Sequence, residues 1–293
     1  MIKLISRDEL NEDKYNACVE SSQESLIYAY SWYLDIVCDQ WNALVLNDYD
    51  AVMPVPYRRK YLIPYVHPPL WVLQLGIFAK GKYYQSDFIL ALQKKFRFIE
   101  LRLNSENTLD KKSPIFVAKQ FQELDLTQNY ETVKTKYQSD RKKDLRKAEK
   151  HELSIEWESK DKQLIDLFKN NVGKRTPEIK EKDYTNLERL IVVCVEKNVG
   201  EVCSVYQDNQ LVAAAFFLKH QETVTILCSS TDFSNRKNGA NTFLIDQAIQ
   251  RFSNDYNTFN FGGSSMKSIA KYFFSFGAEE KIYPMLIKKP KLL

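Results

Sequence analysis

Apolar residues in the second half of the chain recur with periods that predict its elements. Apolar positions three or four residues apart predict helices, and short apolar runs bounded by polar turns predict strands. The expected helices are 130–150, 162–170, 183–197, 241–252 and 265–276, and the expected strands are 154–157, 201–206, 211–219, 223–229, 258–261 and 281–287. Three strands in succession, preceded by helices and followed by alternating elements, are typical of an α+β fold.

The first half of the chain has a less regular pattern. Ser6 and Glu9 fit a capping box, which predicts a helix to about residue 18. Two apolar runs around residues 47–50 predict a β-hairpin. Prolines confine these strands to sheet edges or irregular stretches, because proline has no N–H to donate; they are Pro54, Pro56 and Pro64. Further helices are expected at 32–38 and 86–96, and further strands at 97–103 and 115–121.

The length of the chain and a change in its character indicate two domains. A chain of 293 residues suits one large domain or two of medium size. Residues 126–129 are polar and precede the long helical pattern that opens the second half. We therefore expect the domain boundary there.

Charge and cysteine content narrow the partners and the location. The chain has 42 basic and 38 acidic residues, and its net charge of +4 is too small an excess to demonstrate a nucleic-acid partner. Its five cysteines include no C-x-x-C pair, so neither a disulfide framework nor a metal site is expected. We expect a cytoplasmic protein without a signal peptide or a membrane span, because no apolar run has the length that either needs.

A polar loop with a single glycine precedes the helix expected at 241–252. The N-terminus of a helix offers unpaired N–H groups and the positive end of the helix dipole. Arg236 and Lys237 would add side-chain donors, and Gly239 would let the backbone approach a phosphate closely. The alternative is an ordinary connection from a strand to a helix, in which asparagine and glycine supply the turn.

Three segments between about 201 and 280 together resemble the GNAT superfamily of acyltransferases. The strand that ends at Cys228 corresponds to the splayed central strand of that family, and residues 236–241 (RKNGAN) correspond to its Q/R-x-x-G-x-G/A pyrophosphate loop. Residues 270–277 (AKYFFSFG) correspond to its A-x-x-Y-x-x-x-G-F helix ending. The sequence departs from the pattern at Asn241, where the family has glycine or alanine, and in the inverted final pair, Phe-Gly for Gly-Phe.

The inverted pair and the segment 139–150 (SDRKKDLRKAEK) resemble the Fem-type peptidyltransferases, which carry S-x-x-R-x-x-I-R-K-A-E-K and end in F-K-x-x-F-G. These proteins consist of two GNAT-like domains, each a mixed, mostly antiparallel sheet flanked by helices. The resemblance thus implies an α+β chain with domains at 1–128 and 129–284, and residues 285–293 are a candidate last strand of the first domain. Phe273 stands where the Fem-type motif has lysine, so acyl-CoA is preferred to aminoacyl-tRNA as the donor.

The resemblance also implies residue roles in the second domain. Tyr272 would be a general acid that protonates the leaving thiolate, and Glu201 a general base; the alternatives are a core aromatic and a solvated charge at the start of a strand. The residues implied to bind acyl-CoA are Cys228, Ser229, Ser230, Arg236, Lys237, Asn238, Gly239, Ala240 and Asn241.

In Fem-type proteins the first domain helps to form the groove for the acceptor. The candidates here combine aromatic rings and charge in a segment rich in proline: Tyr57, Arg58, Tyr61 and Trp71. A hairpin of purely structural value is the alternative.

The reaction that these features imply is transfer of an acyl or aminoacyl group to an amine by direct attack, without a metal or a covalent enzyme intermediate. The acceptor would be a small molecule, a peptide or an amino sugar. The alternative is a non-catalytic GNAT-fold binding or scaffold protein whose donor site has decayed, which Asn241 and Phe273 favour. The basic segment 141–150 either contacts RNA or is a solvated helix face laced by ion pairs.

Overall fold

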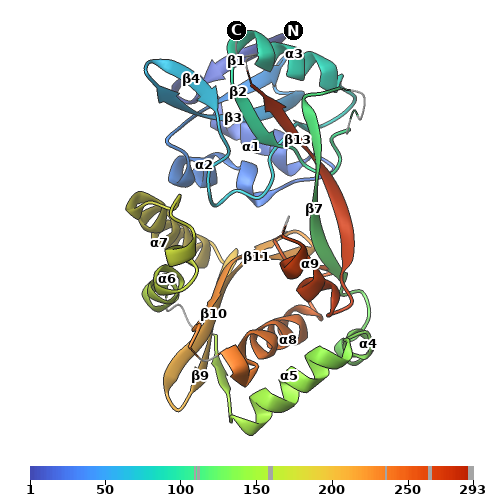
Figure 1. Ribbon diagram of the computed structural model, residues 1–293. Helices are drawn as coiled ribbons and strands as arrows, with labels where there is room; N and C mark the ends of the chain where they lie inside the picture. The colour runs from blue at the N-terminus through green and yellow to red at the C-terminus, as the bar shows by residue number, and fades with distance from the viewer. Residues whose placement is uncertain (109, 111–112, 158–160, 235, 263–265, 290–293) are drawn as a thin grey trace. The chain divides into compact units, whose positions relative to one another are not determined.

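The computed structural model describes residues 1–108, 110, 113–157, 161–234, 236–262 and 266–289 (Figure 1). The chain forms two compact units. Unit 1 contains Met1–Lys119 and the segment that begins at Ile282, and unit 2 contains Gln120–Lys281.

The strands of unit 1 follow the order β1-β2-β3-β4-β6-β13, with β5 beside β3. All of these neighbours are antiparallel except β4 and β6, which run parallel. The strands are β1 (Ile2–Ser6), β2 (Gln40–Leu46), β3 (Ala51–Lys60), β4 (Ile63–Val66), β5 (Phe78–Ala79), β6 (Ile99–Arg102) and β13 (Glu279–Lys288).

The helices of unit 1 pack against this sheet through α3 on β1 and β2, and through α1 on β3 and β5. They are η1 (Arg7–Glu9), α1 (Glu12–Glu20), η2 (Ile27–Ala29), α2 (Ser31–Val37) and α3 (Gln85–Lys95). The first helix begins later than the sequence predicted. Ser6 does donate to Glu9 (2.9 Å), but the α-helix starts at Glu12, because the side chain of Asn11 accepts the N–H of Lys14 and caps it there.

The prediction that prolines keep β3 at a sheet edge was wrong, since β3 lies between β2 and β4. The carbonyl of Pro56 accepts the N–H of His67 (3.2 Å) on the side away from β2. The nitrogens of Pro54 and Pro56 point to that same side, because the N and O of one residue share a direction in a strand. β5 pairs there only with 51–52 and β4 only with 57–60, so the missing N–H groups break no ladder hydrogen bond.

The strands of unit 2 follow the order β7-β12-β11-β10-β9-β8, and only β11 and β12 are parallel. They are β7 (Phe116–Asp125), β8 (Ser154–Glu156), β9 (Gly200–Gln207), β10 (Gln210–His220), β11 (Thr223–Thr231) and β12 (Thr258–Asn260). The α+β prediction with mixed, mostly antiparallel sheets is therefore confirmed.

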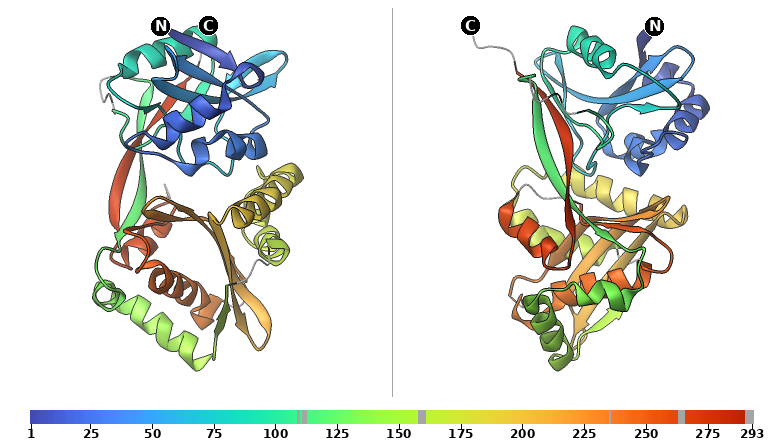
Figure 2. Two further views of the ribbon diagram at one scale, coloured as in Figure 1. Left: turned by 180° about the vertical axis from the view of Figure 1, so that it is seen from behind. Right: turned by 90° about the vertical axis from the view of Figure 1, so that its right-hand side faces the viewer.

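In unit 2, α6 and α7 cover one face of β9–β11, and α5 and α8 lie on the other (Figures 1 and 2). The core between α8 and the sheet is aromatic and aliphatic, with Phe217 of β10 against Phe252 of α8. The helices are α4 (Tyr130–Thr135), α5 (Ser139–Lys150), α6 (Asp161–Asn170), η3 (Gly173–Arg175), α7 (Glu181–Glu196), η4 (Arg236–Asn238), α8 (Ala240–Phe252) and α9 (Lys267–Phe274).

The single helix predicted at 130–150 is two helices in the structure, α4 and α5. Tyr137 lies at the break, buried with its ring edge-on to Phe276 (5.2 Å between centroids). The N–H of Gln138 donates to the carbonyl of Ser275 (2.9 Å) instead of to a preceding turn. Contacts with the C-terminal end of α9 thus end α4 and set the direction in which α5 begins. Of the predicted helix 265–276, Ser265 lies outside the described residues.

Candidate functional site

β11 and β12 share a short parallel contact. Their pairing runs from Thr223 with Thr258 to Thr225 with Asn260, which is the whole length of β12, while β11 continues to Thr231. Leu227 of β11 is a bulge residue, because its neighbours Ile226 and Cys228 pair with Phe217 and Phe216 of β10. The splayed strand that the family resemblance implies stays a prediction.

Gly239 connects this strand region to α8. Position 239 must be a glycine because the backbone of helix α5 leaves no room for a side chain. Its φ of 84° and ψ of 6° are left-handed. A Cβ at this position would overlap the carbonyl oxygen of Asp144 and lie 3.3 Å from the nitrogen of Ala148. The backbone of α5 thus passes directly over the glycine, which explains the residue without a bound phosphate.

The first amide of α8 has a partner within the protein. The side-chain oxygen of Asn238 accepts the N–H of Ala240 (2.9 Å), and its nitrogen donates to Gln207 (2.8 Å). Both Asn238 and Ala240 are buried. The expectation that the Ala240 amide receives a phosphate therefore needs correction, because its hydrogen is already bonded.

Tyr272 meets the start of α8. Its hydroxyl accepts from the side-chain nitrogen of Asn241 (2.9 Å) and shares a hydrogen bond with the hydroxyl of Thr242 (3.1 Å). The guanidinium of Arg141 lies 4.4 Å from the centre of the Tyr272 ring and donates to Thr242 (2.7 Å). The structure thus brings together Tyr272 and Asn241, which the sequence had named separately.

Arg141 is a site residue that the sequence analysis did not single out, although it lies in the segment 139–150 on which the Fem-type resemblance rests. Its side chain is 11% exposed, and it pairs with Asp144 (3.1 Å). Its Nε is buried and has no hydrogen-bond partner among the described residues. The guanidinium of Arg141 is therefore held by Asp144, Thr242 and the Tyr272 ring, and its Nε is enclosed by the protein.

The pKa of Tyr272 is raised above its usual value of 10. Burial is the main cause, and the hydrogen bond with Thr242 and the positive charge of Arg141 oppose it. The hydroxyl therefore keeps its proton at neutral pH, which suits a general acid and does not suit a base.

A cavity of about 370 Å³ lies at this end of α8. Its lining is largely polar and comes from α5, β10, β11, η4, α8 and α9: Arg141, Asp144, Val212, Thr231, Arg236, Asn238, Gly239, Ala240, Asn241, Thr242 and Tyr272. Five of the residues predicted to bind the donor and the predicted acid are in this set.

The remaining predicted donor residues lie outside this lining. Cys228 and Ser230 are buried in β11, and Lys237 is exposed. Ser229 also belongs to β11 and is paired with β10. None of these four residues is among those that line the cavity, so their predicted contact with the donor has no support in this lining.

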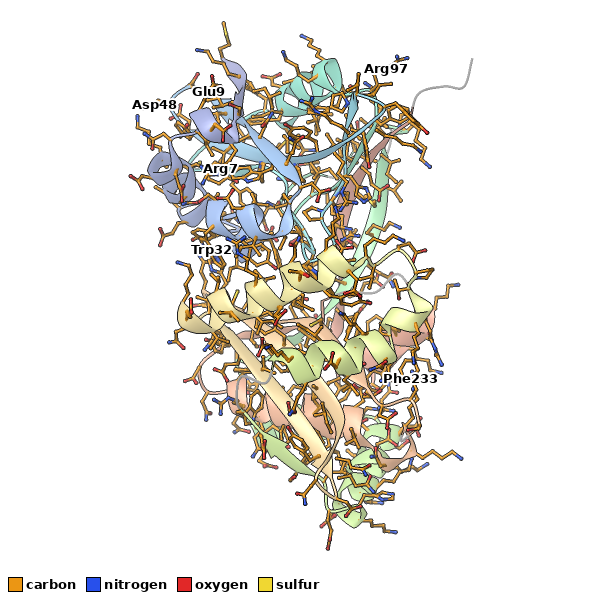
Figure 3. All side chains as sticks on the ribbon, turned by 90° about the vertical axis from the view of Figure 1, so that its left-hand side faces the viewer. Arg7, Glu9, Trp32, Asp48, Arg97 and Phe233 are labelled. Carbon is orange, nitrogen blue, oxygen red and sulfur yellow. The ribbon has the colours of Figure 1, made fainter. Side chains whose placement is uncertain are left out.

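Arg236 stacks on Phe233, with 3.5 Å between the guanidinium carbon and the ring centre; Figure 3 labels Phe233. Arg175 contacts the same ring at 4.1 Å. One half-buried aromatic ring therefore holds two cations near each other at the edge of the site.

Glu201 is at a different place. Its carboxylate accepts from Lys219 (2.8 Å) and from Arg251 (2.7 Å). Burial alone would raise the pKa of Glu201, but the two hydrogen-bonded cations bring it below its usual value of 4.5. Arg251 lies 11 residues after Ala240, which is about 16 Å along the helix at 1.5 Å per residue. A carboxylate held by two cations at the far end of α8 does not suit a general base for this site.

The four predicted acceptor residues do not line one cleft within unit 1. Trp71 is 5% exposed, so its ring is in the core, whereas Tyr61 is 89% exposed at the β3–β4 turn. Arg58 pairs with Asp39 (2.9 Å), and Tyr57 packs against Phe96.

Residues 135–273 match the model of the acetyltransferase (GNAT) domain family. The whole chain is similar to the crystal structure of FemX, with a TM-score of 0.67, 11% identity and 96% of each chain covered. It is also similar to the C-terminal domain of a putative lysylphosphatidylglycerol synthetase from Agrobacterium fabrum (TM-score 0.61, 12% identity, 97% of this chain and 93% of the other). A tandem GNAT protein from the clavulanic acid biosynthesis pathway matches with a TM-score of 0.52, 9% identity and 100% of both chains.

None of the curated proteins matches the chain significantly. Residues 135–273 are thus similar to the GNAT domain family, and the chain as a whole has the fold of the Fem-like tandem GNAT proteins. The resemblance seen in the sequence is confirmed.

Metal-binding groups and membrane-spanning helices are both missing from the described residues. These residues contain no group of three or more histidine, cysteine, aspartate or glutamate side chains that could hold a metal ion. Within the same residues, every helix is too short or too polar to cross a membrane.

Proposed function

We propose that this protein is an N-acyltransferase that moves an acyl or aminoacyl group from acyl-CoA to an amine by direct attack. The observation that carries the proposal is the polar cavity at the start of α8, which is lined by a protonated tyrosine, Tyr272, and by two arginines, Arg141 and Arg236. Aminoacyl-tRNA is the second donor considered, because the fold is shared with Fem-type proteins.

The residues of the cavity divide the work of the reaction. Arg141 and Arg236 suit the phosphates of the donor, since an arginine fork donates to phosphate oxygens. Both arginines line the cavity, whereas the Ala240 amide does not contribute, because it is bonded to Asn238.

The amine nitrogen attacks the thioester carbon, the carbon–sulfur bond breaks, and the thiolate takes the proton of the Tyr272 hydroxyl. Asn241 and Thr242 hold that hydroxyl at the start of α8. The attacking nitrogen releases its proton to water, and the Tyr272 hydroxyl regains its own proton from solvent. Glu201 is not assigned the task of accepting the proton of the amine because of its ion pairs.

Calorimetric titration with acetyl-CoA tests the donor site. We expect saturable binding that Arg236→Ala weakens about tenfold or more, since one charged contact to a phosphate is lost. Lys237→Ala is the matched control, because it removes the same charge from the next residue, which does not line the cavity. Equal weakening by both variants would show that only the general charge of the loop matters and would contradict the site.

A non-catalytic binding protein of the same fold is the second candidate. The internal bond of the Ala240 amide and the positions Asn241 and Phe273, which depart from the family patterns, favour it. Absence of binding heat with coenzyme A, acetyl-CoA and an aminoacyl-tRNA would decide for this candidate.

A further inference from the structure

The turn between β3 and β4 has an unusual composition for its geometry. Lys60 pairs with Ile63, so Tyr61 and Leu62 form a two-residue hairpin loop. Both have positive φ values, 48° and 66°. Such turns strongly prefer Asn-Gly, because side chains larger than asparagine are strained in the left-handed region. A tyrosine and a leucine are therefore held here against the backbone preference.

These two residues also point into solvent. Tyr61 is 89% exposed and Leu62 is 88% exposed, and Ile63 and Phe98 beside them are exposed as well. The hairpin extends from the side of unit 1 (Figure 1). An apolar hollow of about 280 Å³ lies on it, lined by Lys60, Tyr61, Ile63, Tyr65 and Phe98. Tyr61, Leu62, Ile63 and Phe98 are called the hairpin tip below.

The charge around the hairpin tip has one sign. Residues 51–66 contain no aspartate or glutamate, and three basic residues come just before residues of the tip in the chain: Arg59, Lys60 and Arg97. Arg58 is paired with Asp39. Arg59, Lys60 and Arg97 are exposed, and Figure 3 shows Arg97 at the periphery of unit 1. An apolar tip with a cationic collar is the pattern by which peripheral proteins bind anionic lipid surfaces.

We propose that the hairpin tip docks on an anionic phospholipid bilayer. Tyr61 and Leu62 enter the boundary between headgroups and acyl chains, and the cations of the collar contact lipid phosphates. An RNA partner would stack its bases only on the aromatic rings of Tyr61 and Phe98, whereas a bilayer also takes up the aliphatic side chains of Leu62 and Ile63. The proposal does not rest on the acyltransferase reaction, since no residue of the α8 cavity takes part.

Co-sedimentation of the full chain with vesicles tests the proposal. One set of vesicles is phosphatidylcholine, and the other contains about one third phosphatidylglycerol. We expect binding to the anionic vesicles, at least tenfold weaker binding to the neutral ones, and loss of most of the difference at about 1 M salt, where charges are screened within about 3 Å.

The decisive variant is Tyr61→Asn with Leu62→Gly. It supplies the residues that the turn prefers, so the protein should unfold at the same or a higher temperature. It also removes the apolar tip, so vesicle binding should fall at least tenfold. If the turn had only a structural role, the variant would gain stability and its vesicle binding would not change.

Two further variants complete the test. Arg59→Gln with Lys60→Gln should weaken binding to anionic vesicles about tenfold at low salt and leave the neutral vesicles unaffected. Tyr84→Ser with Val192→Ser is the matched control, because it removes an exposed aromatic and an exposed aliphatic side chain elsewhere. Its vesicle binding should equal that of the unchanged protein.

Three results would overturn the proposal. The first is failure of the unchanged protein to bind anionic vesicles. The second is equal binding by the Asn-Gly variant. The third is tighter binding of the unchanged protein to single-stranded RNA than to the vesicles, together with loss of this RNA binding in the Asn-Gly variant.

Discussion

The two ends of helix α8 differ in how their polar groups are used. At its start, Asn241 donates a hydrogen bond to Tyr272, and the guanidinium of Arg141 lies over the Tyr272 ring, beside a cavity of about 370 Å³. Near its end, Glu201 bridges Lys219 and Arg251, and none of the three lines that cavity. Each end holds one of the two catalytic residues predicted from the sequence.

This difference distinguishes a residue that can take part in catalysis from one that only stabilises the fold. A catalytic group must exchange its resting hydrogen bonds for contacts with a substrate that reaches it. The Tyr272 hydroxyl borders a cavity and keeps its proton. Glu201 is neutralised on both sides, and protonating it would break two ion pairs. The start of α8 is therefore the candidate active site, and the end is a structural ion pair.

The largest effect is expected from Gly239→Ala, which tests whether close packing of α5 defines the start of α8. The new Cβ would overlap the Asp144 carbonyl at a positive φ, so unfolding free energy should fall by about 3 kcal/mol or more. Denaturant titration measures it. The control is Gly81→Ala, where a Cβ meets nothing within 4 Å, and the expected change is below about 1 kcal/mol. Similar losses in the two variants would remove the packing argument.

The next largest effect concerns the rate, and it sets the two ends of α8 against each other. Tyr272→Phe should lower the rate of thiol release from acetyl-CoA about a hundredfold, which corresponds to about 2.7 kcal/mol of activation free energy. The amine acceptor for this assay is first found by screening a panel of amines. Glu201→Gln should leave the rate within about twofold. If the two variants lost activity equally, the assignment of roles to the two ends would be wrong.

Arg141→Met should cost about 2 kcal/mol of unfolding free energy, because Asp144 and Thr242 lose a largely buried charged partner. Arg251→Met removes an arginine from the more exposed pair at the other end, and about 1 kcal/mol or less is expected. Thermal unfolding of both variants at one pH gives the comparison. A larger loss for Arg251→Met would reverse the ranking of the two ends.

The smallest effect is the dependence of the Glu201 ion pairs on pH. The folded pKa of Glu201 lies below the unfolded value near 4.5, so its contribution is fully present above about pH 4.5 and is lost as the pH falls through the folded pKa. Glu201→Gln should lower the unfolding free energy by about 1 kcal/mol at pH 7. The gap between the two proteins should then narrow toward pH 3. A gap that stays constant would show that the charge is not its source.

Long periodic elements could be predicted from the sequence, and elements set by tertiary contacts could not. The three strands β9–β11 and helix α8 appear close to their expected ranges, because their apolar periods are regular. The break between α4 and α5 was missed, since it depends on a hydrogen bond from Gln138 to Ser275, a residue far along the chain. β1 was missed because none of its residues is buried and the strand is formed by pairing with β2, which lies about 40 residues later in the chain.

The candidate site shows the same division. Tyr272, Arg236 and Asn241 could be named from local motifs, and they do line one cavity. Arg141 was seen only as part of a charged segment, since nothing local tells which of many cations turns inward. Glu201 was named from its place in a strand, and its two cationic partners come from other elements.

The sequence by itself determined that this chain is an α+β protein whose second half resembles a GNAT domain, because periods, turns and short motifs act over a few residues. Only the tertiary structure decided what Gly239 is for, which amide of α8 is already bonded, and which charges neutralise one another. These depend on groups that are distant in the chain and meet within about 4 Å, a range over which packing and electrostatic energies are set.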